Sequence, residues 1–138
     1  MNCKDLMIGD WVNYSILNLN AKVFSILGNH TIGIQFVDKN NKIEAIHGLL
    51  EETIIPIPLT EEILVNNGFV GVPLTDSYEL NTDYYEIEVW NYSDGLWVVN
   101  VHWIEFSSTP ESKATVSYVH ELQHLFRLCG VEKELVID

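Results

Sequence analysis

Apolar residues in the first 58 positions come in short runs that are interrupted by turn-forming residues. Four runs rich in Val, Ile and Phe, namely "DWVNYSI", "AKVFSILG", "TIGIQFV" and "KIEAIHGLL", are separated by Gly and Asn. Runs of this length bounded by turn residues predict β-strands. Asn29 and His30 are expected to make a tight hairpin connection, and the segment "DKNNK" at 38–42 a polar loop. The pattern predicts a meander of four or five strands that forms a small barrel-like sheet.

The segment "PIPLTEEILVNNGF" carries the local signals of a helix. Thr60 can accept hydrogen bonds from the first free amides, and Glu61 and Glu62 lie where the helix dipole favours negative charge. Asn67 and Gly68 provide a left-handed stop. These signals predict a linking helix of about two turns from Thr60 to Asn67.

After a polar loop, apolar and polar residues alternate in "DYYEIEVW" and "GLWVVNVHWIEF", which predicts two strands of a hairpin. Asp94 and Gly95 are the expected turn residues. One face of the second strand is apolar, and it carries Trp97, Val99, Val101 and Trp103. A third strand is expected at "ATVSY", and the tail "VEKELVID" is expected to form a final short strand or to fray.

The pattern changes to a helical period from Val119 to Cys129. An apolar stripe, which we expect to pack on the sheet, collects Tyr118, Val119, Leu122, Leu125, Phe126 and Cys129. The opposite side, expected to point away from the sheet, carries His120, Gln123, His124 and Arg127. The fold class predicted is α+β. Residues 1–58 form a small barrel-like β lobe, and residues 59–138 hold the linking helix, an antiparallel sheet and the C-terminal helix that packs on it.

Within this last helix, His120, Glu121 and His124 spell "HELQH", which fits the H-E-x-x-H pattern of zinc hydrolases. On a helix the two histidines of this pattern lie on successive turns and bind zinc, while the glutamate acts as general base. One hypothesis is therefore a zinc-dependent hydrolase, with His120 and His124 as metal ligands and Glu121 as the catalytic residue.

The third zinc ligand is missing from this hypothesis. Metzincins place Gly and His three and six residues beyond the second histidine, where this chain has Arg127 and Gly130. The 14 residues that follow His124 predict no helix that could supply a gluzincin ligand, which leaves Glu132 and Glu134. The positive charge of Arg127 on the same face opposes a dication. We therefore expect a solvated helix face, no cofactor and no enzymatic activity, with zinc and hydrolysis as the alternative.

Charge limits the classes of partner. Twenty acidic residues against seven basic ones give a net charge of −13, which repels nucleic-acid backbones and anionic lipid surfaces. A direct nucleic-acid ligand is therefore not expected, although an acidic mimic of nucleic acid remains an alternative. Cys3 and Cys129 have no C-x-x-C spacing, and no stretch approaches the roughly 20 apolar residues of a membrane span. The start of the chain has no secretion signal, so the expected location is the cytoplasm, without membrane contact.

Aromatic residues crowd the predicted hairpin, where Trp90, Tyr92, Trp97 and Trp103 lie within 14 positions. Aromatic side chains are enriched where proteins bind one another. Trp90 and Tyr92, near the hairpin end, are the residues predicted to form an interaction surface. The negative charge can attract a basic protein surface, although solubility alone would also account for it. The charge and these aromatics together suggest a surface for a protein partner.

Three segments, "DLMIGDWV", "PIPLTEEILVNNGF" and "YVHELQHLFRLCG", carry a family resemblance. In this order and spacing they are similar to a family of uncharacterised proteins from prophages and other mobile elements of Bacteroides and related bacteria. The resemblance implies a phage-encoded intracellular protein and an architectural role for the last helix. The family has no assigned enzymatic activity, cofactor or binding residues, so the resemblance assigns no role to any residue of this chain. We expect a non-enzymatic accessory or interaction protein, with a host or phage protein as its partner.

Overall fold

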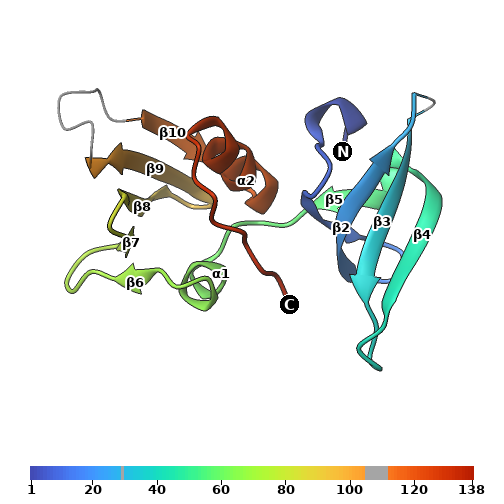
Figure 1. The fold of residues 1–138 in the computed structure, drawn as a ribbon, viewed down its shortest axis with the longest axis horizontal. Coiled ribbons are helices and arrows are strands. Elements are labelled where there is room, and N and C mark those ends of the chain that lie inside the picture. The colour runs from blue at the N-terminus through green and yellow to red at the C-terminus, as the bar shows by residue number, and fades with distance from the viewer. Residues whose placement is uncertain (29, 105–111) are drawn as a thin grey trace. The chain divides into compact units, whose positions relative to one another are not determined.

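The computed structural model describes residues 1–28, 30–104 and 112–138 (Figure 1). The chain divides into two compact units, Met1–Ile57 with Ile137–Asp138, and Pro58–Val136. Within these residues each unit has its own five-stranded antiparallel sheet, and the helices α1 and α2 belong to the second unit. The prediction of a mixed α+β fold is confirmed.

The sheet of the first unit has the strand order β4-β3-β2-β1-β5. Its strands are β1 (Trp11–Tyr14), β2 (Leu19–Ile26), β3 (Thr31–Val37), β4 (Ile43–Leu50) and β5 (Ile54–Pro56), with short 3-10 turns η1 (Cys3–Asp5) and η2 (Glu51–Thr53). One face forms a core in which Val12, Val23, Ile32, Ile34 and Ile54 are fully buried. The last two described residues complete this unit: Ile137 is buried, and the Asn20 side-chain amide donates to the Asp138 carbonyl at 2.8 Å.

Local turn chemistry accounts for the hairpins of this sheet. Asp38 closes the β3–β4 loop, because its Oδ1 accepts from the amides of Asn40 and Lys42 at 2.8 and 2.9 Å. This confirms the polar loop at 38–42. His30 has a positive φ of 63°, as a tight β2–β3 connection requires. Asn29, its predicted partner in that turn, lies outside the described residues.

The prediction of a barrel-like first sheet is wrong in one respect, because the sheet is not closed. β4 and β5 are the two ends of the strand order, and no pairing joins them among the described residues. β5 is three residues long and already pairs with β1, from Tyr14↔Ile54 to Val12↔Pro56. Pro56 has no amide hydrogen to donate. A strand so short cannot supply the second ladder that closure needs.

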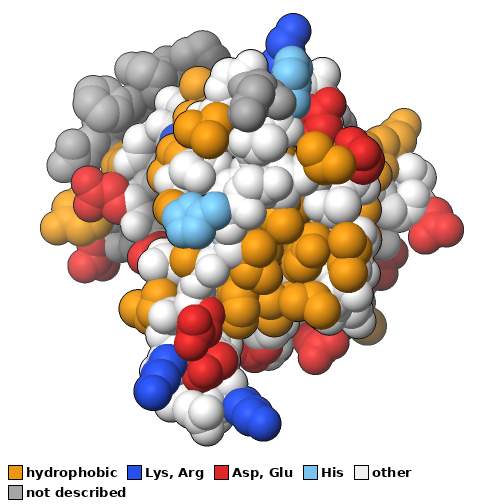
Figure 2. Space-filling view, turned by 90° about the vertical axis from the view of Figure 1, so that its right-hand side faces the viewer, with side chains coloured by type: hydrophobic (Ala, Val, Ile, Leu, Met, Phe, Trp, Pro, Cys, Tyr) orange, Lys and Arg blue, Asp and Glu red, His pale blue; other side chains and the backbone are white. Residues whose placement is uncertain are grey.

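The edge strand β4 brings apolar side chains to the surface of the first unit. Ile43 and Leu50, at its two ends, are both more than half exposed. Figure 2, which looks onto this unit, shows hydrophobic side chains gathered in one area of the surface. Gly48 has a positive φ of 68° beside a bulge in the β3–β4 ladder, which interrupts regular pairing along this strand.

The sheet of the second unit has the strand order β10-β9-β8-β7-β6. Its strands are β6 (Val70–Gly71), β7 (Ser77–Asn81), β8 (Tyr85–Ser93), β9 (Leu96–Trp103) and β10 (Ser112–Val116). The predicted β8–β9 hairpin is confirmed: Ser93 pairs with Leu96, and Gly95 has a φ of 74°. β7 was expected to be part of a polar loop. It is a strand, because all five of its residues pair with β8.

Two helices complete the second unit, α1 (Glu61–Asn66) and α2 (Val119–Leu128). Thr60 caps α1, since its Oγ1 accepts from the Ile63 amide at 3.3 Å, and Gly68 follows the helix with a φ of 91°. Gly130, with a φ of 71°, follows α2 in the same way. The local signals for both helices are confirmed.

The second sheet has one covered face. Val99 and Val101 are buried on it, and the indole of Trp103, on the same face, donates to the Cys129 carbonyl just after α2 at 2.9 Å. The indole of Trp97 donates to the Leu59 carbonyl just before α1 at 3.0 Å. Both helical segments are therefore fastened to this face.

The C-terminal tail is neither a strand nor frayed. Val131 and Leu135 are buried, and the side chain of Asn67 holds the backbone of Val136 in both directions, at 2.7 and 2.9 Å. The side-chain amide of Asn67 therefore holds the tail in place, where a strand ladder was expected to hold it. In the part of the chain that the structure describes, no helix is long and apolar enough to cross a membrane.

Candidate functional site

Glu121, the proposed catalytic residue of the HELQH string, caps its own helix. Its Oε1 accepts from the amides of Ser117 and Tyr118, each at 3.0 Å. The first amides of a helix have no partner within the helix, and a carboxylate at this position satisfies them and complements the helix dipole. The observed contacts of Glu121 are thus those of a structural cap.

The expected solvent exposure of this side of the helix is wrong for His120. His120 is 7% exposed, and Gln123 on the next turn is 8% exposed, whereas both were placed on the solvated side. The buried arc of α2 runs through Val119, Leu122 and Phe126 and continues onto these two polar side chains. The apolar residues alone predict a narrower buried arc on the helix. Their pattern does not show whether the protein encloses a helix on more than one side.

The histidine rings lie against each other and against an aromatic neighbour. The His120 and His124 rings are 5.5 Å apart between centroids and nearly perpendicular, and the His120 ring stacks on Tyr118 at 5.9 Å. Among residues 1–28, 30–104 and 112–138, no group of three or more His, Cys, Asp or Glu side chains is placed to hold a metal ion. A catalytic zinc site needs three protein ligands. The described residues therefore do not fit this metal, and no hydrolytic step is derived from them.

A different polar constellation lies on the second sheet, on the face opposite to the covered one. We call it the open face. Its residues form two rows across the strands, one through Glu79, Glu88 and Asn100, the other through Asn81, Glu86 and His102. These six side chains line a hollow of about 280 Å³. None of them is classed as buried, so their charges stay in contact with solvent.

Three glutamates line this hollow, and two of them face each other across neighbouring strands. Glu79 and Glu88 are direct cross-strand partners, and Glu86 lies two residues along the same strand and face as Glu88. Like charges directly opposite one another destabilise a sheet. Folding alone would favour a neutral or oppositely charged partner for Glu88. The pair is therefore a candidate for a binding role.

Trp90 and Tyr92, the predicted interaction residues, lie along the same strand. Trp90 is half-buried on the open face, where it pairs with Ser77 and Val98. Tyr92 is 71% exposed, at an irregularity in the β8–β9 ladder near the turn. The structure thus places an indole on the same face as the three carboxylates.

Sequence reasoning missed Glu79, because β7 was taken as loop. A signal was present in "SYELN", where Tyr78 and Leu80 alternate with polar residues. Glu86 and Glu88 are both on the open face, and so is His102, which pairs with Glu86.

Models of known protein families, curated proteins and solved structures were compared with the chain, and none matches it. Function is therefore inferred from the chemistry of the open face and of the other surfaces described above.

Proposed function

We propose that the protein is a non-enzymatic interaction module of a prophage or another mobile element, and that it binds a basic surface of a host or phage protein in the host cytoplasm. The open face of the second sheet is the proposed binding surface. The resemblance of three sequence segments to mobile-element proteins supports the biological setting. The geometry of the open face supports the mode of action.

The observation that carries the proposal is the facing pair Glu79 and Glu88, with Glu86 beside it, on a sheet face that also carries Trp90. A lysine or arginine side chain in the hollow would relieve the repulsion between the carboxylates. A cation is also attracted to an indole face, by about 0.5–2 kcal/mol. The open face therefore combines the two features that recognise a basic side chain.

The charge of the whole chain supports the same partner chemistry. A net charge of −13 steers basic proteins toward the molecule and slows the approach of acidic ones. Tyr92, largely exposed near the end of the hairpin, extends the surface with a side chain that loses little conformational freedom when it is covered. Long-range attraction and local contacts thus favour the same class of partner.

The test uses the full chain labelled with ¹⁵N and a short peptide rich in lysine and arginine as the probe. We expect saturable shifts of the Trp90 indole signal and of the amides of β7, β8 and β9, with binding that weakens as salt is added. The double variant Glu79→Gln, Glu88→Gln should weaken binding about two- to thirty-fold, since each exposed ion pair contributes about 0.2–1 kcal/mol.

A matched control separates local recognition from general attraction. The double variant Glu44→Gln, Glu52→Gln removes the same charge from two exposed residues of the first unit. It should retain most of the affinity. Equal weakening by both double variants would contradict a site on the open face, and so would shifts scattered over the whole acidic surface.

A further inference from the structure

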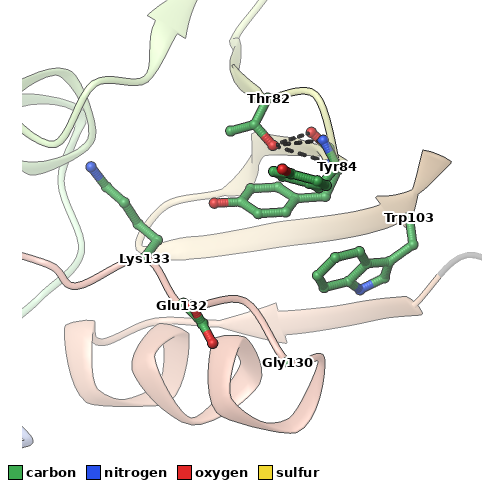
Figure 3. Close-up of a pocket in the computed structure, with 7 residues that line it drawn as sticks. Thr82, Tyr84, Trp103, Gly130, Glu132 and Lys133 are labelled. Carbon is green, nitrogen blue, oxygen red and sulfur yellow. Dashed lines mark hydrogen bonds between the residues drawn. The ribbon is translucent and has the colours of Figure 1, made fainter. Parts of the chain in front are cut away.

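A second hollow lies in the second unit, between the turn that joins β7 to β8 and the segment that follows α2. Its volume is about 490 Å³, within the usual range for small-ligand pockets. Three aromatic residues line it, Tyr84, Tyr85 and Trp103 (Figure 3). We call it the aromatic hollow. Tyr85 and Trp103 are on the covered face of the sheet, so this hollow is distinct from the open face.

The aromatic walls are held in place by the protein itself. Tyr85 and Trp103 are cross-strand partners, with ring centroids 5.4 Å apart at an angle of 68°. Thr82 orders the turn, because its Oγ1 accepts from the amides of Tyr84 and Tyr85 at 3.2 Å each. The indole bond to the Cys129 carbonyl fixes Trp103. A ligand would therefore meet a preformed site and would lose little affinity to ordering it.

Tyr84 is the wall that is most open to a ligand. Its side chain is 63% exposed, although its backbone is tied down, since its carbonyl accepts from the Ile104 amide at 3.0 Å. Gly130 leaves room on the opposite wall: a Cβ at this position would lie 3.8 Å from Trp103. The hollow thus offers aromatic surface that folding leaves uncovered.

The charges around the hollow favour a cation. Glu132, an exposed acidic residue, is part of its lining. Lys133 contributes its side-chain stem, but its Nζ lies 3.9 Å from the position of a Cβ on Gly68, at the C-terminal end of α1. That end carries partial negative charge, which attracts an ammonium group. Figure 3 shows Lys133 directed away from the three rings, so its positive charge does not occupy the hollow.

We propose that the aromatic hollow binds an organic ammonium group, most favourably a methylated one. Such a group is attracted to aromatic faces and is only weakly hydrated, so little is lost when the rings surround it. Glu132 supplies the countercharge. The ammonium group can belong to a free small molecule or to a modified lysine side chain of a peptide, and the two sources share this chemistry.

The test titrates tetramethylammonium chloride into the ¹⁵N-labelled full chain, with tert-butanol as a neutral molecule of similar shape. We expect tetramethylammonium to move the Trp103 indole signal and the Tyr84 amide signal saturably, and tert-butanol to leave both unchanged. A peptide with one trimethyl-lysine, compared with the same peptide with norleucine, distinguishes the sources. Binding of that peptide at least tenfold tighter than tetramethylammonium identifies a side chain, and equal or weaker binding identifies a free cation.

Two variants and a control locate the site. Tyr84→Ala should weaken tetramethylammonium binding about three- to thirty-fold, the range expected for one cation–aromatic contact. Glu132→Gln should weaken tetramethylammonium binding several-fold without removing any aromatic surface. This variant provides the test if Tyr84→Ala does not fold. Tyr92→Ala removes another exposed tyrosine of the same unit, outside the aromatic hollow, and should leave tetramethylammonium binding unchanged. Equal shifts with tert-butanol, or unchanged binding in Tyr84→Ala and Glu132→Gln, would overturn the proposal.

This inference does not rest on the proposed binding of a basic protein, and the two can fail separately. Trp90→Ala should weaken the lysine- and arginine-rich peptide and leave tetramethylammonium binding intact. Tyr84→Ala should do the reverse.

Discussion

The two faces of the second sheet are built from the same strands but satisfy different requirements. On β9, Val99 and Val101 are buried on the covered face, while Asn100 and His102, which alternate with them, are partly exposed on the open face. The covered face is apolar and fastened to both helical segments by indole hydrogen bonds. The open face keeps two carboxylates directly opposite each other.

The difference separates residues that stabilise the fold from residues that weaken it. On the covered face Val99 and Val101 are buried, and the indoles of Trp97 and Trp103 donate to backbone carbonyls. Glu79 and Glu88 face each other across neighbouring strands, and the repulsion between their like charges opposes folding. A position that costs stability and is nevertheless occupied by a charge is a better guide to function than a motif such as HELQH, whose glutamate is accounted for by a helix cap.

The largest effect is expected when a buried valine of β9 is replaced by alanine, in comparison with the same change at a valine on the open face. Val99→Ala removes two buried methyl groups and leaves a cavity, which should lower the free energy of unfolding by about 2–3 kcal/mol. Val98→Ala removes the same atoms from the neighbouring half-buried position on the open face and should cost less than about 1 kcal/mol. Urea unfolding of both variants measures the difference. Equal losses would mean that the open face is also packed.

The next effect concerns the helix that covers the sheet. Glu121→Ala removes the acceptor of two backbone amides and should cost about 1–2 kcal/mol. Glu121→Gln keeps an acceptor oxygen and loses only the charge, so it should cost about 0.5 kcal/mol. Thermal unfolding of the two variants provides the measurement. If the glutamine variant were as unstable as the alanine variant, hydrogen bonding would not be the role of Glu121.

A smaller effect of opposite sign is expected on the open face. Glu88→Gln removes the repulsion from Glu79 and should raise the free energy of unfolding by about 0.2–1 kcal/mol. The gain should shrink in about 1 M salt, where exposed charges are screened. Glu44→Gln, an exposed residue of the first sheet, is the control for the change in net charge. Loss of stability in Glu88→Gln at low salt would contradict the assigned repulsion.

The smallest effect is a dependence on pH at the edge of the covered face. The Tyr78 hydroxyl donates to the Glu61 carboxylate of α1, which, together with burial and the charges of Glu61 and Asp76, raises the pKa of Tyr78 to about 12. The unfolded chain releases this proton near pH 10, before the folded protein does. The contribution of Tyr78 to stability is therefore complete below about pH 10 and is lost as the pH rises toward 12.

Tyr78→Phe isolates this contribution. Wild type should be more stable than Tyr78→Phe at pH 8, and the difference in urea midpoint should narrow between about pH 10 and 12. The comparison cancels the alkaline effects that both proteins share. A difference that stays constant over this range would argue against the bond to Glu61.

Elements with local signals could be predicted from the sequence, and elements that depend on distant partners could not. The cap at Thr60 and the stop at Gly68 are encoded within a few residues of α1, and the β8–β9 turn is encoded by Asp94 and Gly95. β7 exists because Ser77–Asn81 pairs with β8, and its loop-like surroundings hid the alternation of Tyr78 and Leu80. The first sheet stays open because β5 is short, and no local sequence pattern predicts the length of β5.

The candidate sites follow the same rule. Trp90 and Tyr92 could be chosen from the sequence because aromatic residues crowd one hairpin. The opposition of Glu79 to Glu88 could not, since it depends on strand register. The burial of His120 depends on what surrounds α2, and the aromatic hollow joins the turn at Thr82 to a glycine almost 50 positions later. The Glu79–Glu88 pair, the burial of His120 and the aromatic hollow all depend on which separate segments of the chain lie close together in the fold.

The first unit is made of two separate stretches of chain, and this has a consequence for its biogenesis. Residues 1–57 are translated before the second unit, but Ile137 and Asp138 are translated only after it. The packing of the first unit and the hydrogen bond from Asn20 to Asp138 are therefore complete only once residue 138 has been made. Removing Ile137 and Asp138, or separating them from residues 1–57 by a cut at Pro58, would leave the first unit without these contacts.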